Sequence, residues 1–232
     1  MFGDVVLLIA IALGVIFVVR ARRQLTELAA QIRELRAHAV SHVTYTPVGS
    51  PELADELDAA TREAEQAGFT MLGDYLEEST AREAELAMRW FTDARGTTFG
   101  WMAPFDVKGT REVVIVLMSH ELAAETITSR APKASALSRP PFVRVQHVEL
   151  TASFKDTVAA HRTFAKLDDD TRGFVPVKSF EQLGHELDRM RGKAIAWRQA
   201  QPEGDLLEAD LRNLLGGQYR RLGKAMRRRL AG

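Results

Sequence analysis

The chain has 232 residues, 46% of them hydrophobic and 27% charged, and its 31 basic and 31 acidic side chains cancel. This length suits one ordinary domain with appendages or two small domains, and the composition is that of a folded protein. Zero net charge gives no argument for nucleic acid or an acidic partner. The absence of cysteine excludes disulfides, thiol catalysis and cysteine-bound metals.

The start of the chain predicts a membrane anchor. Residues 5–19 contain no charged or polar side chain, and a helix that is apolar on every side has no aqueous face. A helix of this length reaches about 22 Å into a hydrocarbon core about 30 Å thick, so residues 1–3 and the extended side chain of Arg20 are needed to complete the span. The anchor positions are Val5, Leu8, Ile11, Val15, Phe17 and Val19.

A cleaved signal peptide is the competing interpretation, because its apolar region has a similar length. Such a peptide needs basic residues before the apolar stretch, whereas here Asp4 precedes it and Arg20, Arg22 and Arg23 follow it. Basic residues beside a span stay in the cytoplasm. We therefore expect an uncleaved signal-anchor in the inner (plasma) membrane, with the N-terminus outside and the body in the cytoplasm.

A helical stalk is predicted after the anchor, because Leu25, Leu28, Ile32 and Leu35 repeat at intervals of 3, 4 and 3 residues. This is the spacing of a coiled coil, sustained over about two heptads. Two interpretations stay open: a coiled coil that joins two copies in a homodimer, and a stalk that packs on the protein's own body. The segment 45–51 predicts a linker or turn.

The layout of anchor, basic stop, short stalk and cytoplasmic body resembles that of many bacterial single-pass membrane proteins, including divisome and envelope-scaffold components. The resemblance covers the anchor and the stalk. It implies no functional residue in the body.

The body begins with a predicted helix that has Ser50 as N-cap, Pro51 at its first position and Gly68 just beyond its end. Short strands with turn signals between them follow, which predicts an antiparallel meander of about five or six strands. The apolar run 113–118 is the candidate central strand. The expected strands cover residues 69–76, 84–92, 97–105, 112–120, 125–129 and 142–150.

Three more helices complete the predicted α+β fold. The first opens with a capping box of Ser153 and Asp156, and its core face carries Phe154, Val158, His161 and Phe164. Two amphipathic helices follow on either side of Pro202, as an antiparallel hairpin or docked separately. The expected units are the anchor 1–20, the stalk and linker 21–49, an α+β domain 50–167, and a C-terminal helical hairpin with a basic tail, 168–232.

Candidate metal ligands are sparse. His38 and His42 share a helical spacing but have no third ligand nearby, and the triplet Asp168, Asp169 and Asp170 lacks the alternating ligands of a calcium loop. Solvated side chains explain both groups. We expect no metal.

Catalytic fragments are weak as well. Ser119-His120-Glu121, or Ser153 with His161, could belong to a hydrolase, but neither serine lies in a nucleophile elbow and no phosphate-binding glycine loop is present. We expect no catalytic residue and no cofactor. The sequence favours an interaction or scaffolding domain; a membrane-tethered enzyme or ligand-binding domain is the alternative.

The C-terminal segment predicts a basic amphipathic helix, in which Leu222, Met226 and Leu230 alternate with cations. A solvated face, or one that meets the acidic stretch 52–85 of this chain, is the first interpretation. An anionic bilayer surface comes next, then nucleic acid or an unknown protein partner. The cations are Arg220, Arg221, Lys224, Arg227, Arg228 and Arg229.

Overall fold

The structure is a computed structural model that describes residues 43–48, 51–79, 86–107, 109–131, 137–167 and 173–215, with single positions between 23 and 40. The expected anchor and the basic C-terminal helix lie outside these residues. Within the described part, no helix has both the length and the apolar character that crossing a membrane requires.

Seven strands form one sheet whose order, β1 to β7, follows the chain. The strands are β1 (Val43–Pro47), β2 (Phe69–Ser79), β3 (Leu86–Asp93), β4 (Phe99–Val107), β5 (Thr110–His120), β6 (Glu125–Arg130) and β7 (Val143–Val148). The helices of the described part are α2 (Pro51–Gln66), α3 (Phe154–Ala165), α4 (Phe180–Ala200) and α5 (Glu203–Leu215). The α+β class and the mostly antiparallel sheet are confirmed.

The sheet differs from the predicted meander at both edges. Residues 43–47, expected as a linker, form β1 and pair antiparallel with β2. A five-residue edge strand that ends in proline gives a weak sequence signal. At the other edge, β7 pairs parallel with β6. The connection 131–142 is long enough to return the chain to the same end of the sheet, which a tight hairpin cannot do.

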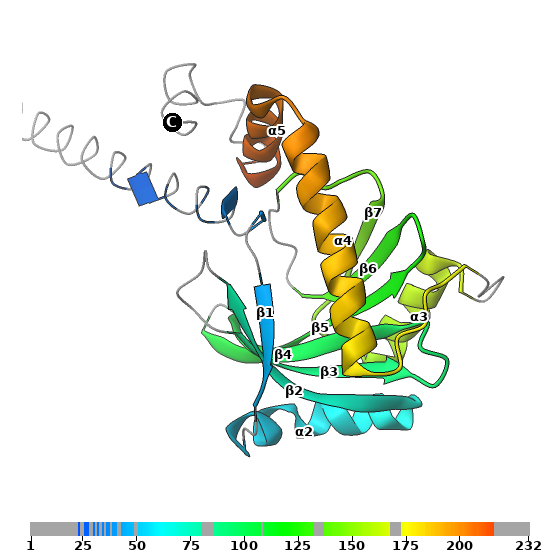
Figure 1. Cartoon of the computed structure of the whole chain (residues 1–232). Helices are drawn as coiled ribbons and strands as arrows, with labels where there is room; N and C mark the ends of the chain where they lie inside the picture. The colour runs from blue at the N-terminus through cyan, green and yellow to red at the C-terminus, as the bar shows by residue number, and fades with distance from the viewer. Residues whose placement is uncertain are drawn as a thin grey trace, which may run out of the picture.

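Both faces of the sheet are covered. Helices α2 and α3 pack on one face and α4 lies across the other (Figure 1). Neighbouring residues of a strand therefore enter different cores: in β3, Phe91 packs toward α2 and α3, while Trp90 packs toward α4. The run 113–118 in β5 is apolar throughout for this reason.

The predicted C-terminus of α2 and the predicted N-terminus of α3 are confirmed, while Ser50, the expected N-cap of α2, lies outside the described residues. The Ser153 hydroxyl caps α3 by accepting a hydrogen bond from the Asp156 N–H at 3.1 Å. Gly68, just beyond α2, has a φ of +85°, a conformation that glycine adopts without strain. On α3, Phe154, Val158 and His161 are buried as expected.

Helices α4 and α5 meet through a buried ion pair. Arg198 donates to Asp210 at 2.6 Å, and the other Asp210 oxygen accepts from the Ser138 N–H at 2.8 Å. From the stalk, Arg36 lies 3.5 Å from the same carboxylate, and Ile32 is only 2% exposed. At these two positions the stalk packs on the protein's own body, as one of the two stalk interpretations expects.

Candidate functional site

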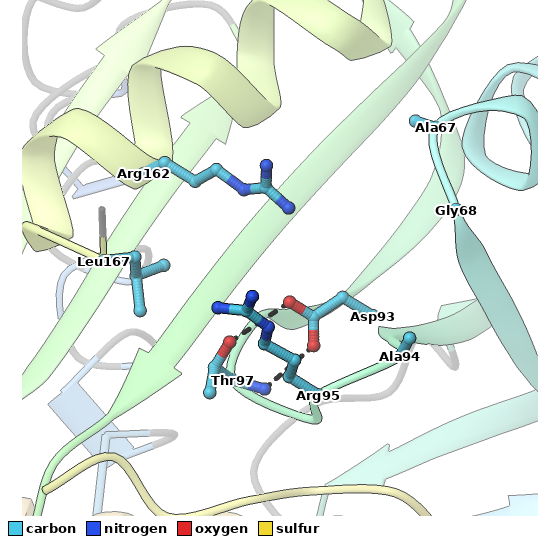
Figure 2. Close-up of a pocket in the computed structure, with 8 residues that line it drawn as sticks. All are labelled: Ala67, Gly68, Asp93, Ala94, Arg95, Thr97, Arg162 and Leu167. Atoms are coloured by element: carbon cyan, nitrogen blue, oxygen red, sulfur yellow. Dashed lines mark hydrogen bonds between the residues drawn. The ribbon is translucent and has the colours of Figure 1, made fainter. Parts of the chain in front are cut away.

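A polar hollow of about 390 Å³ lies where the turn after α2, the β3–β4 turn and the end of α3 meet (Figure 2). Its floor is the buried pair Asp93 and Thr97. The Asp93 carboxylate accepts from the Thr97 N–H at 2.9 Å and from the Thr97 hydroxyl at 3.1 Å. These two bonds close the β3–β4 turn, so the floor has a fixed shape.

The β3–β4 turn is also fixed from outside the sheet. Gly96, with a φ of +76°, lies so close to the segment before α4 that an added Cβ would come within 2.8 Å of the Val177 nitrogen. The Gly96 carbonyl accepts from the Val177 N–H at 2.9 Å, and the Thr92 hydroxyl donates to the Val177 carbonyl at 2.6 Å. Arg95, between Asp93 and Gly96, therefore projects from a rigid turn.

Two arginines form the rim of the hollow. Figure 2 shows Arg95 reaching in from the β3–β4 turn and Arg162 from α3. Both side chains are exposed, and neither has a hydrogen bond or ion pair in the described part of the chain. The same holds for Lys155 and Lys166, the other cations of this helix and its C-cap. Within the described residues, these four cations around α3 thus have no acidic partner.

A buried polar chain lies behind the hollow. The Ser119 hydroxyl donates to the Thr97 carbonyl at 2.6 Å and lies 2.9 Å from His161 Nε2. On the far side of the ring, Nδ1 lies 2.9 Å from the Thr128 hydroxyl, which accepts from Gln146 Nε2 at 2.8 Å. Ser119, Thr128 and His161 are all 0% exposed.

The direction of these bonds leaves Ser119 without a general base in this arrangement. A carbonyl only accepts, so the Ser119 proton points to Thr97 and the Ser119 oxygen accepts from His161 Nε2–H. His161 Nδ1 then accepts from the Thr128 hydroxyl. A general base would need a free nitrogen lone pair facing the serine, and both ring nitrogens of His161 are occupied.

The environment of His161 favours the neutral ring. Burial lowers the pKa of His161 from 6.5 to about 3, and the charge of the neighbouring Arg162 adds to this effect. A positive ring would have no acidic partner in this network. His161 therefore works as a neutral link between α3 and the sheet.

His120 lies on the other face of the sheet, because successive strand residues alternate. It packs edge-on against Phe99, with ring centroids 4.8 Å apart. Its Nε2 is 3.0 Å from Glu125, and its Nδ1 is 3.5 Å from Glu186 of α4. Arg189 holds the Glu186 carboxylate at 2.6 Å. This cluster joins α4 to the sheet, and the predicted fragment Ser119-His120-Glu121 is divided between two cores.

The second predicted fragment is also divided: Ser153 caps α3, while His161 bonds to Ser119 and Thr128. His38, His42, the triplet 168–170 and the basic C-terminal helix fall outside the described residues. Across the described residues, no group of three or more His, Asp or Glu side chains is arranged to hold a metal.

Sequence reasoning missed the two features that the fold assembles here. The signal for the polar chain was His161 on an otherwise apolar helix face, because a buried imidazole needs partners. No local pattern joins Arg95 to Arg162, which are far apart in the sequence.

Comparisons with known proteins find no matching family model, no similar curated protein and no similar solved structure.

Proposed function

We propose that this chain is a single-pass inner-membrane protein whose cytoplasmic α+β body is an interaction or scaffolding domain. The observation that carries the proposal is the sealed Ser119–His161 pair. It joins a potential nucleophile to a potential base, but it is closed to solvent and its hydrogen bonds are already used. The polar groups that the body offers to other molecules lie on its surface instead.

The contact between stalk and hairpin supports a fixed position for the body. Arg36 approaches Asp210, which Arg198 and Ser138 also bind. A helix from Arg20 to Arg36 would span about 24 Å. Helix α5 would then lie within that distance of the headgroups, and the body would be held close to the membrane.

The basic C-terminal segment fits the same arrangement. It follows α5 directly in sequence, so it can reach an anionic bilayer surface, where each basic residue contributes about 1 kcal/mol of binding free energy. Contact with the acidic stretch 52–85, with nucleic acid or with a protein partner remains an alternative for this segment.

Membrane extraction tests the proposal. The full chain should remain in the pellet after washing with alkaline carbonate, and a variant without residues 1–20 should move to the supernatant. Chemical crosslinking of intact membranes should then link the full chain to a defined partner protein. Release of the full chain by carbonate would contradict the anchor. Measurable turnover by the purified full chain, with any substrate class, would contradict the non-catalytic role.

A further inference from the structure

We infer that the hollow between Arg95 and Arg162 binds the phosphate group of a small phosphorylated compound that also carries hydroxyl groups. This site goes beyond the proposed function and does not rest on it. Figure 2 shows the residues that line this hollow.

The two arginines at the rim favour an anionic ligand. Guanidinium groups are planar and always charged, and their paired N–H donors match two oxygens of a phosphate. Arg95 and Arg162 point into one hollow from two separate elements, and among the described residues no acid forms a hydrogen bond or ion pair with either of them. Glu63, on the neighbouring helix, accepts from the Phe154 N–H at 3.2 Å and is turned to the start of α3. Lys155 and Lys166 add positive charge on the same helix surface.

The Asp93 carboxylate at the floor of the hollow favours hydroxyl groups on the ligand. Asp93 is 8% exposed, and each of its oxygens accepts one hydrogen bond from Thr97. A carboxylate oxygen has a second lone pair, so each can still accept from a ligand O–H. The negative floor also disfavours a bare anion at depth. A phosphate at the rim with a hydroxyl-bearing carbon skeleton below it satisfies both parts of the site.

Size and rigidity fit this ligand class. The volume of about 390 Å³ lies in the range of small-molecule sites, which begins near 300 Å³. Gly68 leaves one wall open, because an added Cβ would meet no atom within 4 Å. The Val177 contacts hold Arg95's turn and the His161 chain holds α3. Little ordering of the backbone is therefore needed on binding.

Calorimetry on the full chain in phosphatidylcholine nanodiscs tests the site with ribose 5-phosphate, inorganic phosphate and ribose. Ribose 5-phosphate should bind most tightly and inorganic phosphate more weakly, while ribose should give no measurable heat. Arg95→Gln and Arg162→Gln should each weaken ribose 5-phosphate binding about tenfold, because each removes a charge-assisted hydrogen bond. Arg95→Lys and Arg162→Lys should lose less, since they keep the charge.

Arg111→Gln is the matched control. Arg111 is an exposed arginine at the other end of β5, where it lies 3.0 Å from Glu56. Its removal should leave binding within about twofold. The site is contradicted if the wild-type chain does not bind ribose 5-phosphate, if ribose binds equally well, or if Arg111→Gln weakens binding as much as Arg162→Gln. Unfolding midpoints confirm that the compared variants are folded.

A second set of nanodiscs, containing phosphatidic acid, distinguishes a soluble ligand from a lipid headgroup. If the headgroup phosphate is the natural ligand, it should compete with ribose 5-phosphate and lower its apparent affinity in the wild-type chain. Arg162→Gln should abolish this competition. An unchanged titration identifies a soluble phosphate compound as the ligand. If none of these ligands binds, the proposed phosphate site is contradicted. The proposed membrane anchor and interaction function are not affected by that result.

Discussion

His161 is a titratable side chain that the fold holds without charge between α3 and the sheet. Its two ring nitrogens are bonded to Ser119 and Thr128, and neither partner carries a charge. Neutral hydrogen bonds of this kind stabilise the folded state modestly when both partners are present. Loss of one partner, or a charge on it, destabilises the folded state strongly, because a buried polar group is then left unsatisfied. We therefore expect His161 to make the stability of the domain depend on pH.

The pKa of His161 is about 3 in the folded chain and 6.5 as an ordinary value. Between these two values the unfolded chain binds a proton that the folded chain does not. The contribution of His161 to the free energy of unfolding should therefore be complete above pH 6.5. It should fall by about 1.4 kcal/mol per pH unit as the pH drops toward 3. Denaturant unfolding of the full chain in detergent, between pH 4.5 and 7.5, measures this slope.

His161→Gln provides the comparison, because glutamine can bond to both neighbours but does not titrate. The stability advantage of the wild-type chain over this variant should shrink by about 2 to 3 kcal/mol between pH 6.5 and 4.5. A constant difference across that range would show that His161 is not held neutral.

Gly100 is a residue whose hydrogen side chain is required by the sheet. A Cβ at this position would lie 2.0 Å from the Val116 carbonyl oxygen, near the start of β4, where Gly100 is paired with Leu117 of β5. Gly100→Ala should lower the free energy of unfolding by at least about 3 kcal/mol, because the two strands would have to separate. Gly184→Ala in α4, where an added Cβ meets nothing within 4 Å, should instead raise stability by about 0.5 to 1 kcal/mol. Equal effects of the two substitutions would contradict the strand register.

Among the elements, the α4–α5 hairpin depends on one buried ion pair. Asp210 is 0% exposed, and its carboxylate accepts from Arg198 and from the Ser138 backbone. Asp210→Ala should cost about 3 to 5 kcal/mol, since it leaves the Arg198 charge buried without a partner. Hydrogen exchange should show faster exchange in α5 and in residues 137–140.

The double variant Arg198→Met with Asp210→Leu tests whether charge or shape holds this hairpin. Replacing both partners by apolar side chains removes the unpaired charge, so most of the lost stability should return. If the double variant is as unstable as Asp210→Ala, packing of the arginine stem and the backbone bond to Ser138 matter more than the ion pair.

Elements with strong periodicity could be predicted from the sequence. The helix spans, the Ser153 cap and strands β2 to β6 follow from apolar spacing and turn residues, which act locally. The two sheet edges could not be predicted in the same way. Strand β1 is short and ends in Pro47, so its sequence resembles that of a linker. The direction of β7 is decided by where the long connection 131–142 crosses, which depends on packing against distant helices.

The candidate site was beyond the reach of local patterns. Arg95 belongs to a turn and Arg162 to a helix, and only the fold of the sheet brings them to one hollow. The pairing of Ser119 with His161 has the same origin. Sequence could say that His161 lies on a buried helix face, and it could not say which strand residue would meet it.

For the whole molecule, the two ends of the chain and the α3 surface differ in charge. The uncharged stretch 5–19 precedes a group of arginines, and cations follow α5 at the other end. If the stalk holds the body at the membrane through Arg36, the hollow beside α3 remains free for a soluble compound. Anchoring and ligand binding can then be tested independently.

Site-directed labelling of membrane topology tests the central claim most directly, because the chain contains no cysteine of its own. Single cysteines at Gly3 and at Leu122, whose side chain is 74% exposed, report on the two sides of the membrane. In intact spheroplasts, a maleimide reagent that cannot cross the membrane should label Gly3→Cys and leave Leu122→Cys unlabelled until the cells are lysed. Labelling of Leu122→Cys before lysis, or recovery of the chain in the soluble fraction, would contradict a membrane-anchored cytoplasmic body.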